Sequence, residues 1–102
     1  MTDLRKLARG RECAVRIPGV CNGDPETTVL AHFRLAGISG MGIKSPDLIA
    51  AFACSACHDA IDRRAHTDLD RDYVRLAHLE GVVRTQAELL KLGVIQIGRA
   101  AA

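Results

Sequence analysis

The chain has 102 residues and a formal net charge of +2, so it has the length of one domain and no charge excess that indicates a nucleic-acid binder. Aromatic residues make up 3% of the sequence, and a core this thin benefits from a stabilising metal or disulfide. No segment approaches the roughly 18 consecutive apolar residues of a membrane span, and residues 1–11 lack the apolar run of a signal peptide. We therefore expect a cytoplasmic protein without a membrane segment.

The charge is unevenly distributed along the chain. Residues 1–44 contain seven basic and four acidic residues, whereas residues 45–102 contain seven basic and eight acidic ones. The basic excess lies around the first two cysteines, at Arg5, Lys6, Arg9, Arg11 and Arg16. Such a cluster is either a solvated face or a patch that faces phosphate groups.

The first third of the chain predicts a short helix, a loop and a strand. Asp3 is a suitable N-cap for a basic helix that ends at Gly10. The loop that follows is rich in glycine, proline and asparagine, which favour turns, and it contains the first two cysteines. Residues 27–33 are rich in β-forming side chains, so we expect a strand there.

The rest of the chain predicts a second strand and two helices. Residues 48–53 form a short apolar run that is expected to return as a buried strand against the first one. A helix should begin near Cys57, because no helix breaker follows it closely. Residues 70–92 show helical spacing and stop at Gly93, with one apolar packing stripe. The members of that stripe are Leu76, Leu79, Val83, Ala87 and Leu90.

Four cysteines are grouped in two pairs that predict one zinc site. Cys54 and Cys57 form a C-x-x-C knuckle, whose spacing lets both thiolates face one ion. Cys13 and Cys21 have seven residues between them, and the turn at residues 18–19 can fold that loop back so that both sulfurs converge. In a reducing cytoplasm, four cysteines favour metal ligation over disulfides. The pattern therefore predicts a closed, structural four-thiolate site.

Three other interpretations of the cysteines stay open at this point. Cys13 and Cys21 can be small buried hydrophobic residues. The C-x-x-C pair can be a redox pair, although no thioredoxin-like βαβ pattern surrounds it. The run from Cys54 to His58 also matches the c-type haem attachment motif, but that chemistry requires export and leaves the first two cysteines without a role.

Two of the four histidines lie where they can serve chemistry. His32 ends the first predicted strand, and His58 directly follows the second cysteine pair. His58 and Asp62 are separated by four residues, so they project from one helix face and offer an imidazole and a carboxylate to a cation. His66 lies another four residues on, whereas His78 is interpreted as an ordinary surface or core residue.

This arrangement suits phosphodiester hydrolysis. A neutral histidine can accept a proton from water near pH 7, which makes His32 a candidate general base. A divalent cation with open coordination positions can polarise the phosphoryl oxygen and stabilise the departing 3′-oxygen. The alternative is that His32 and His58 only form structural caps or hydrogen bonds.

The segment from Cys13 to His66 resembles an HNH, or ββα-metal, endonuclease, with a cysteine quartet, a histidine that ends the first strand and a final Cys-x-x-Cys-His. More narrowly, the runs RECAVRIPGVCNGDPETTVLAH and LIAAFACSACHDAIDRR are similar to the YbcO-like family of small phage and prophage nucleases. The resemblance extends to about residue 64. It implies DNA as the partner, structural Zn²⁺, and Mg²⁺ or another divalent cation for catalysis.

The resemblance also implies roles for single residues. His32 matches the general base, and His58 matches a ligand of the catalytic cation. Asp62 corresponds to a second ligand, one helical turn later. Asp47 lies near the position of the middle asparagine that orients the base, although its spacing to the cysteine pair is longer than usual. Ala31 departs from the pattern, because many relatives have an acidic or histidine metal ligand there.

We therefore predict an α+β fold: one HNH-like nuclease domain over residues 1–102, with a zinc-stabilised ββα core at 11–66 and a C-terminal packing helix at 70–92. The predicted function is metal-dependent DNA endonuclease. The alternative is a non-catalytic zinc-binding module that binds nucleic acid or a partner protein. The expected phosphate contacts are Arg11, Arg16, Arg34, Arg63 and Arg64. The oligomeric state and the form of DNA, whether duplex, branched or single-stranded, are left open by the sequence.

Overall fold

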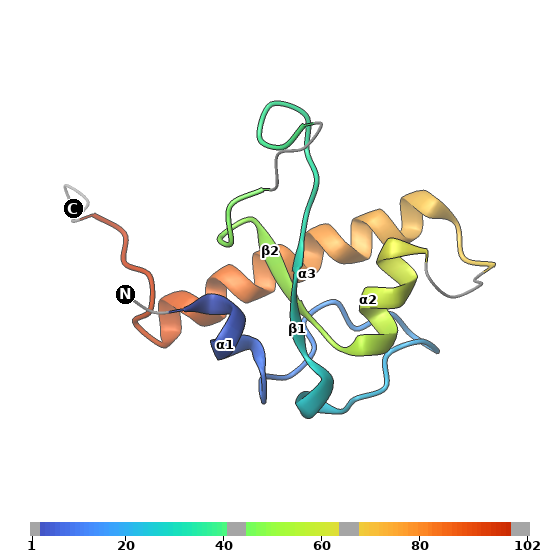
Figure 1. Cartoon of the computed structure of the whole chain (residues 1–102), viewed down its shortest axis with the longest axis horizontal. Helices are drawn as coiled ribbons and strands as arrows, with labels where there is room; N and C mark the ends of the chain where they lie inside the picture. The colour runs from blue at the N-terminus through green and yellow to red at the C-terminus, as the bar shows by residue number, and fades with distance from the viewer. Residues whose placement is uncertain (1–2, 41–44, 64–67, 99–102) are drawn as a thin grey trace.

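The computed structural model describes residues 3–40, 45–63 and 68–98. A two-stranded sheet lies against a long helix, with two shorter helices at the sides of the sheet (Figure 1). In chain order the elements are α1 (Leu4–Ala8), a 3₁₀ turn (Pro25–Thr27), β1 (Val29–His32), β2 (Ala50–Ala53), α2 (Ser55–Asp62) and α3 (Arg71–Lys91). This is the α+β arrangement that the sequence predicts. The described residues contain no helix with the length and apolar character needed to cross a membrane.

The sheet is an antiparallel hairpin with a small-residue face. Its register pairs Leu30 with Phe52 and His32 with Ala50. All four residues of β2 are buried, and three of them are alanines, so α3 can approach the sheet closely. At the contact α3 has Gly81, where an added Cβ would lie 3.2 Å from Ala51 Cβ of β2 and 2.8 Å from Val15 Cγ2 of the loop before β1. The core therefore depends on close backbone approach more than on large side chains.

The observed strands and helices begin and end close to their predicted positions. Both strands are shorter than predicted because residues 27 and 48 belong to neighbouring turns. Helix α1 is capped by Asp3, whose Oδ1 accepts hydrogen bonds from the backbone N–H groups of Arg5 and Lys6. Helix α2 begins at Ser55, before the predicted start, because Cys54 acts as its N-cap. These local predictions are confirmed to within a few residues.

The predicted packing stripe of α3 is wrong. Leu76 and Val83 are 55% and 60% exposed, and the other stripe members are exposed as well. The face that meets the sheet instead consists of Val74, His78, Gly81, Val82, Thr85 and Leu89. Two of these side chains bond to the sheet backbone: Thr85 Oγ1 accepts from Phe52 N at 2.9 Å, and His78 Nε2 lies 2.9 Å from the Ala31 carbonyl oxygen. Because the sheet offers small side chains and backbone groups, His78, Gly81 and Thr85 fit this face beside its apolar residues.

Candidate functional site

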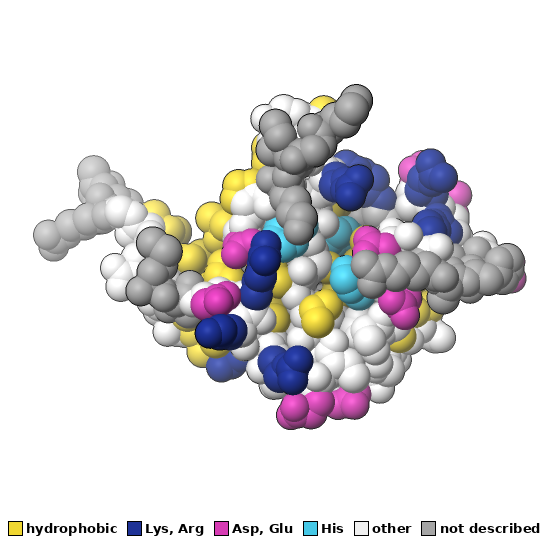
Figure 2. Space-filling model, in the orientation of Figure 1, with side chains coloured by type: hydrophobic (Ala, Val, Ile, Leu, Met, Phe, Trp, Pro, Cys, Tyr) yellow, Lys and Arg dark blue, Asp and Glu magenta, His cyan; other side chains and the backbone are white. Residues whose placement is uncertain are grey.

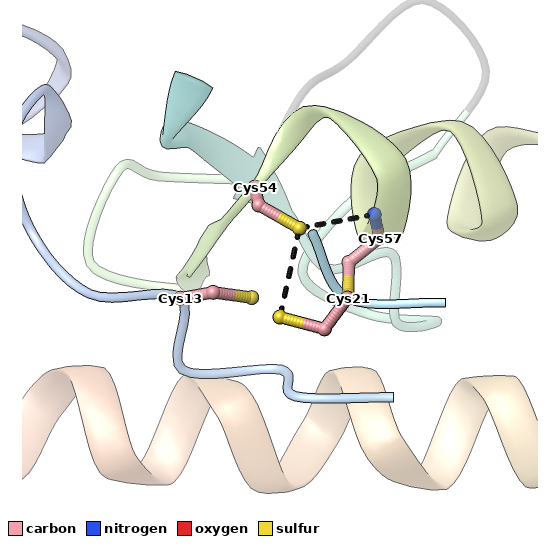
Figure 3. Close-up of side chains that lie close together, drawn as sticks. All are labelled: Cys13, Cys21, Cys54 and Cys57. Atoms are coloured by element: carbon pink, nitrogen blue, oxygen red, sulfur yellow. Dashed lines mark hydrogen bonds between the residues drawn. The ribbon is translucent and has the colours of Figure 1, made fainter. Parts of the chain in front are cut away.

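The four cysteine sulfurs meet at one point beside the hairpin (Figure 3). Cys54 directly follows β2, Cys57 lies in the first turn of α2, and Cys13 and Cys21 come from the loop before β1. All four Sγ atoms lie within 4.8 Å of one another, and Cys54 Sγ lies 3.8 Å from Cys21 Sγ. All four thiols are free. The two pairs therefore form the single cluster that their spacing predicts.

Backbone N–H groups point at two of these sulfurs. Cys13 Sγ accepts from Arg16 N and Cys54 Sγ accepts from Cys57 N, each at 3.4 Å. A hydrogen bond from the Cys57 thiol lowers the pKa of Cys13 to about 4, and the bond from Arg16 N adds to this effect against the cost of burial. The same shared proton, together with burial, raises the pKa of Cys57. The cluster thus has donors arranged to stabilise negative sulfur.

The cluster fits a tetrahedral zinc ion by its chemistry and its dimensions. Thiolates are preferred zinc ligands, and four sulfurs at the usual distance of roughly 2.3 Å from zinc lie about 3.8 Å apart. The separation of Cys54 Sγ from Cys21 Sγ has this value, 3.8 Å. Cys54 and Cys57 are fully buried and leave no open position for substrate on their side. A closed set of four thiolates is typical of a structural site.

His32 and Asp47 form a close pair at the end of the hairpin. His32 is the last residue of β1, and its Nε2 lies 2.7 Å from Asp47 Oδ1. The pair forms because the turn before β2 brings residue 47 back to the end of β1. The hydrogen bond from His32, reinforced by the charge of Arg5, lowers the pKa of Asp47. Arg5 Nε lies 3.7 Å from Asp47 Oδ1, so α1 also reaches this pair.

His58 and Asp62 form a second pair on α2. His58 Nε2 lies 3.2 Å from Asp62 Oδ2, one helical turn away, and both side chains are partly exposed. The backbone N–H of His58 donates to the carbonyl of Cys54, which ties the histidine to the cysteine knuckle. Two ligand atoms that each bind an ion at about 2.1 Å can lie 3 to 4 Å apart. An imidazole and a carboxylate at 3.2 Å therefore fit a shared divalent cation.

A cavity of about 550 Å³ connects these groups. Both His32 and Asp62 line it, so one member of each pair opens into the same space. Histidine side chains gather at the middle of this face, between acidic and basic side chains (Figure 2). The structure therefore brings the proposed base and a proposed cation ligand to one cavity.

The predicted phosphate-contacting arginines separate into two groups. Arg34 and Arg63 line the cavity. Arg11 lies 4.0 Å from Glu88 and lines a different pocket together with Arg16. The side chain of Arg16 donates from Nε to the Cys13 carbonyl oxygen at 3.1 Å, which directs it to the cysteine loop. Two further predicted positions, residues 64 and 66 (Arg64 and His66), lie outside the described residues.

Two arginines that line the cavity, and the contact of Arg5 with Asp47, were not predicted from the sequence. Arg71 and Arg75 of α3 line it, and Arg5 contacts Asp47. The spacing of Arg71 and Arg75, four residues apart at the start of a helix, is the signal that could have indicated a shared face. No sequence signal connects Arg5 to Asp47, because that contact depends on where α1 docks.

His78 has a structural role. It is buried against the hairpin, and its ring lies edge-on to Phe33 with the centroids 5.0 Å apart. Burial lowers the pKa of His78, so the ring stays neutral and its Nε2–H can donate to the Ala31 carbonyl oxygen. The sequence interpretation of this residue as an ordinary core or surface histidine agrees with its position.

The fold and the site together define a small α+β protein with a four-cysteine cluster beside a cavity lined by histidine and arginine. The family described as "Putative nuclease YbcO" matches residues 2–94, and the chain belongs to this family. It is 66% identical over 96 residues to "Putative nuclease YbcO" of Escherichia coli (strain K12), with 94% of this chain and 99% of that protein covered. The identity and coverage are the same for "Putative nuclease ybcO" of Enterobacteria phage 82.

A solved structure has a similar fold. It is described as "Structure of a putative bacteriophage protein from Escherichia coli str. K-12 substr. MG1655". The two chains are 60% identical and superpose with a TM-score of 0.75, over 89% of this chain and all of the other. The arrangement of helices and hairpin is therefore shared with a relative of known structure.

Proposed function

We propose that this protein is a metal-dependent endonuclease of the HNH, or ββα-metal, type that hydrolyses phosphodiester bonds of DNA. The observation that carries the proposal is the common cavity, which is lined by His32 from the hairpin and by Asp62 from the following helix. The order of strand, strand and helix around it supports the HNH type. Nuclease activity also agrees with the names of the relatives in E. coli and phage 82.

In this proposal His32 is the general base. Its Nε2 faces the Asp47 carboxylate at 2.7 Å, so the carboxylate fixes the tautomer with the proton on Nε2. The other ring nitrogen, Nδ1, is then free to take a proton from water. The resulting hydroxide oxygen bonds to phosphorus as the bond to the 3′-oxygen breaks. The departing 3′-oxygen takes a proton from solvent, which gives a 5′-phosphate and a 3′-hydroxyl.

His58 and Asp62 would hold the cation, which supplies charge to stabilise the phosphoryl and departing oxygens. The four-cysteine cluster would hold a structural Zn²⁺. The knuckle fixes the start of α2, and the hydrogen bond from His58 N to the Cys54 carbonyl oxygen ties the ligand helix to it. A zinc ion held there would therefore help to position His58 and Asp62 without taking part in the reaction.

Plasmid nicking tests the proposed activity. Zinc-loaded protein is incubated with supercoiled plasmid, with and without added Mg²⁺ or Mn²⁺. We expect nicked circles when a divalent cation is added and none when zinc-loaded protein is used alone. Saturable, salt-sensitive DNA binding without cleavage under either cation would instead support the non-catalytic zinc module.

Two substitutions of Asp47 test whether its hydrogen bond to His32 or its negative charge is needed for nicking. The Asp47→Asn variant keeps an oxygen that can accept the His32 Nε2–H, so we expect it to retain nicking within about tenfold of wild type. Asp47→Ala removes the acceptor and should lower the rate by about 10- to 100-fold, the usual effect of losing an orienting partner. Single-turnover nicking rates measure both variants. Equal rates for the alanine variant and wild type would show that Asp47 does not orient the base.

A further inference from the structure

We propose that the cavity beside His32 contains a phosphate-binding subsite built largely by α3, in which Arg71 and Arg75 join Arg34 and Arg63. This subsite would hold a DNA phosphate that neighbours the one being cut. The inference rests on the proposed function and adds a binding role for the C-terminal helix, which the sequence predicts only as a packing element.

The charge of the cavity favours an anion. Four arginines from three segments line it: Arg34 follows β1, Arg63 caps α2, and Arg71 and Arg75 belong to α3. One lining carboxylate, Asp62, opposes them. With neutral histidines, four positive charges and one negative charge give a local charge of +3 in a chain whose net charge is +2. Positive charge concentrated in a hollow raises the local concentration of an anionic ligand.

Two of the four guanidinium groups are held in place without being neutralised. Arg75 Nη2 donates to the carbonyl oxygen of Arg34 at 3.1 Å, and its Cζ lies 4.5 Å from the centre of the Phe33 ring. Arg63 Nη1 donates to the carbonyl oxygen of Leu69 at 3.2 Å. Within residues 3–40, 45–63 and 68–98, no carboxylate lies within 4.0 Å of any of the four guanidinium groups. Each group has five N–H donors, so several remain to bind phosphate oxygens.

The position of two of the arginines at the start of α3 also favours binding of an anion. Arg71 and Arg75 lie one turn apart at the start of a 21-residue helix, where the helix dipole favours negative charge. The cavity volume of about 550 Å³ exceeds the space of one phosphate and lies in the range of ligand sites. Because His32 lines the same cavity, a strand bound there would reach both the proposed base and the arginines.

A matched pair of charge substitutions tests the subsite. Arg71→Gln removes one positive charge at the first residue of α3, and Lys91→Gln removes one at its last residue, about 30 Å away along the helix. Both are made in a His32→Ala background, and dissociation constants for a short DNA are measured over a range of salt concentrations. We expect Arg71→Gln to weaken binding several-fold and to reduce the salt slope by about 0.7 to 0.9, the contribution of one phosphate contact. Lys91→Gln should change neither quantity.

A neutral methylphosphonate placed at single positions of the DNA locates the contact. At one position it should weaken binding of the parent protein and leave binding of the Arg71→Gln variant unchanged. If the Arg71 and Lys91 variants lose the same amount of DNA affinity, with unchanged unfolding midpoints, the subsite is overturned, even if wild type nicks plasmid. If only Arg71→Gln loses DNA affinity and wild type never nicks plasmid, the subsite is supported and the proposed nuclease activity is overturned. No measurable DNA binding would overturn both.

Discussion

Replacing Cys54 by serine is expected to abolish the folded state. Cys54 is fully buried, caps α2, and places its sulfur 3.8 Å from that of Cys21. Structural zinc typically contributes about 10 to 16 kcal/mol of apparent binding free energy. That range is comparable to the roughly 5 to 15 kcal/mol of net stability of an ordinary domain, so its loss removes most or all of the stability. A serine hydroxyl is a poor zinc ligand, so this variant should lose both the ion and cooperative unfolding.

Circular dichroism and metal content per chain measure this outcome. Wild type should contain one zinc per chain, and strong chelation should produce the same spectrum as Cys54→Ser. Adding zinc back should restore wild type and leave the variant unfolded. Serine at the exposed position Ala87 of α3 provides a control that adds a hydroxyl away from the cluster. A Cys54→Ser protein that unfolds at the wild-type temperature would contradict the structural role of the cluster.

Replacing His32 by alanine is expected to remove cleavage and to preserve the fold. General base catalysis typically contributes 10²- to 10⁴-fold, so single-turnover nicking should fall by about that factor. The side chain is 20% exposed and lies at the end of β1, where its hydrogen bond is to the partly exposed Asp47. Removing it opens no large internal cavity, so the unfolding midpoint should stay within a few degrees of wild type.

Added imidazole provides a control for this variant. Imidazole that enters the space left by the side chain should restore part of the nicking rate of His32→Ala. It should have no effect on a variant of the proposed cation ligands, such as Asp62→Asn. Nicking by His32→Ala within a few-fold of the wild-type rate, at equal cation concentration, would show that another group activates the water.

Local features of the fold could be predicted because short-range chemistry determines them. Asp3 and Asp70 cap their helices through bonds to backbone groups two or three residues away. The C-x-x-C spacing and the four-residue separation of His58 from Asp62 likewise fix relative positions without knowledge of the fold. The turn at residues 18–19 brings Cys13 close to Cys21, whereas the meeting of the two pairs also depends on the pairing of β1 with β2 between them.

The packing of α3 could not be predicted, because hydrophobicity alone does not reveal what a helix meets. A sheet whose buried strand is mostly alanine offers backbone groups, and the Thr85 hydroxyl and the His78 imidazole bind them. The leucine stripe consequently faces away from the core. The predicted phosphate-contacting arginines do not all line the cavity, for a similar reason. Arg16 has a left-handed backbone and donates to the Cys13 carbonyl oxygen, and both features follow from the folded cysteine loop.

The most direct test of the central proposal is the cation dependence of nicking in zinc-loaded wild type, His58→Ala and Asp62→Asn. If this pair holds the catalytic cation, half-maximal nicking should require at least about tenfold more Mn²⁺ in either variant than in wild type. Zinc content should remain one per chain in all three proteins. Unchanged Mn²⁺ dependence in both variants would contradict a cation site at His58 and Asp62.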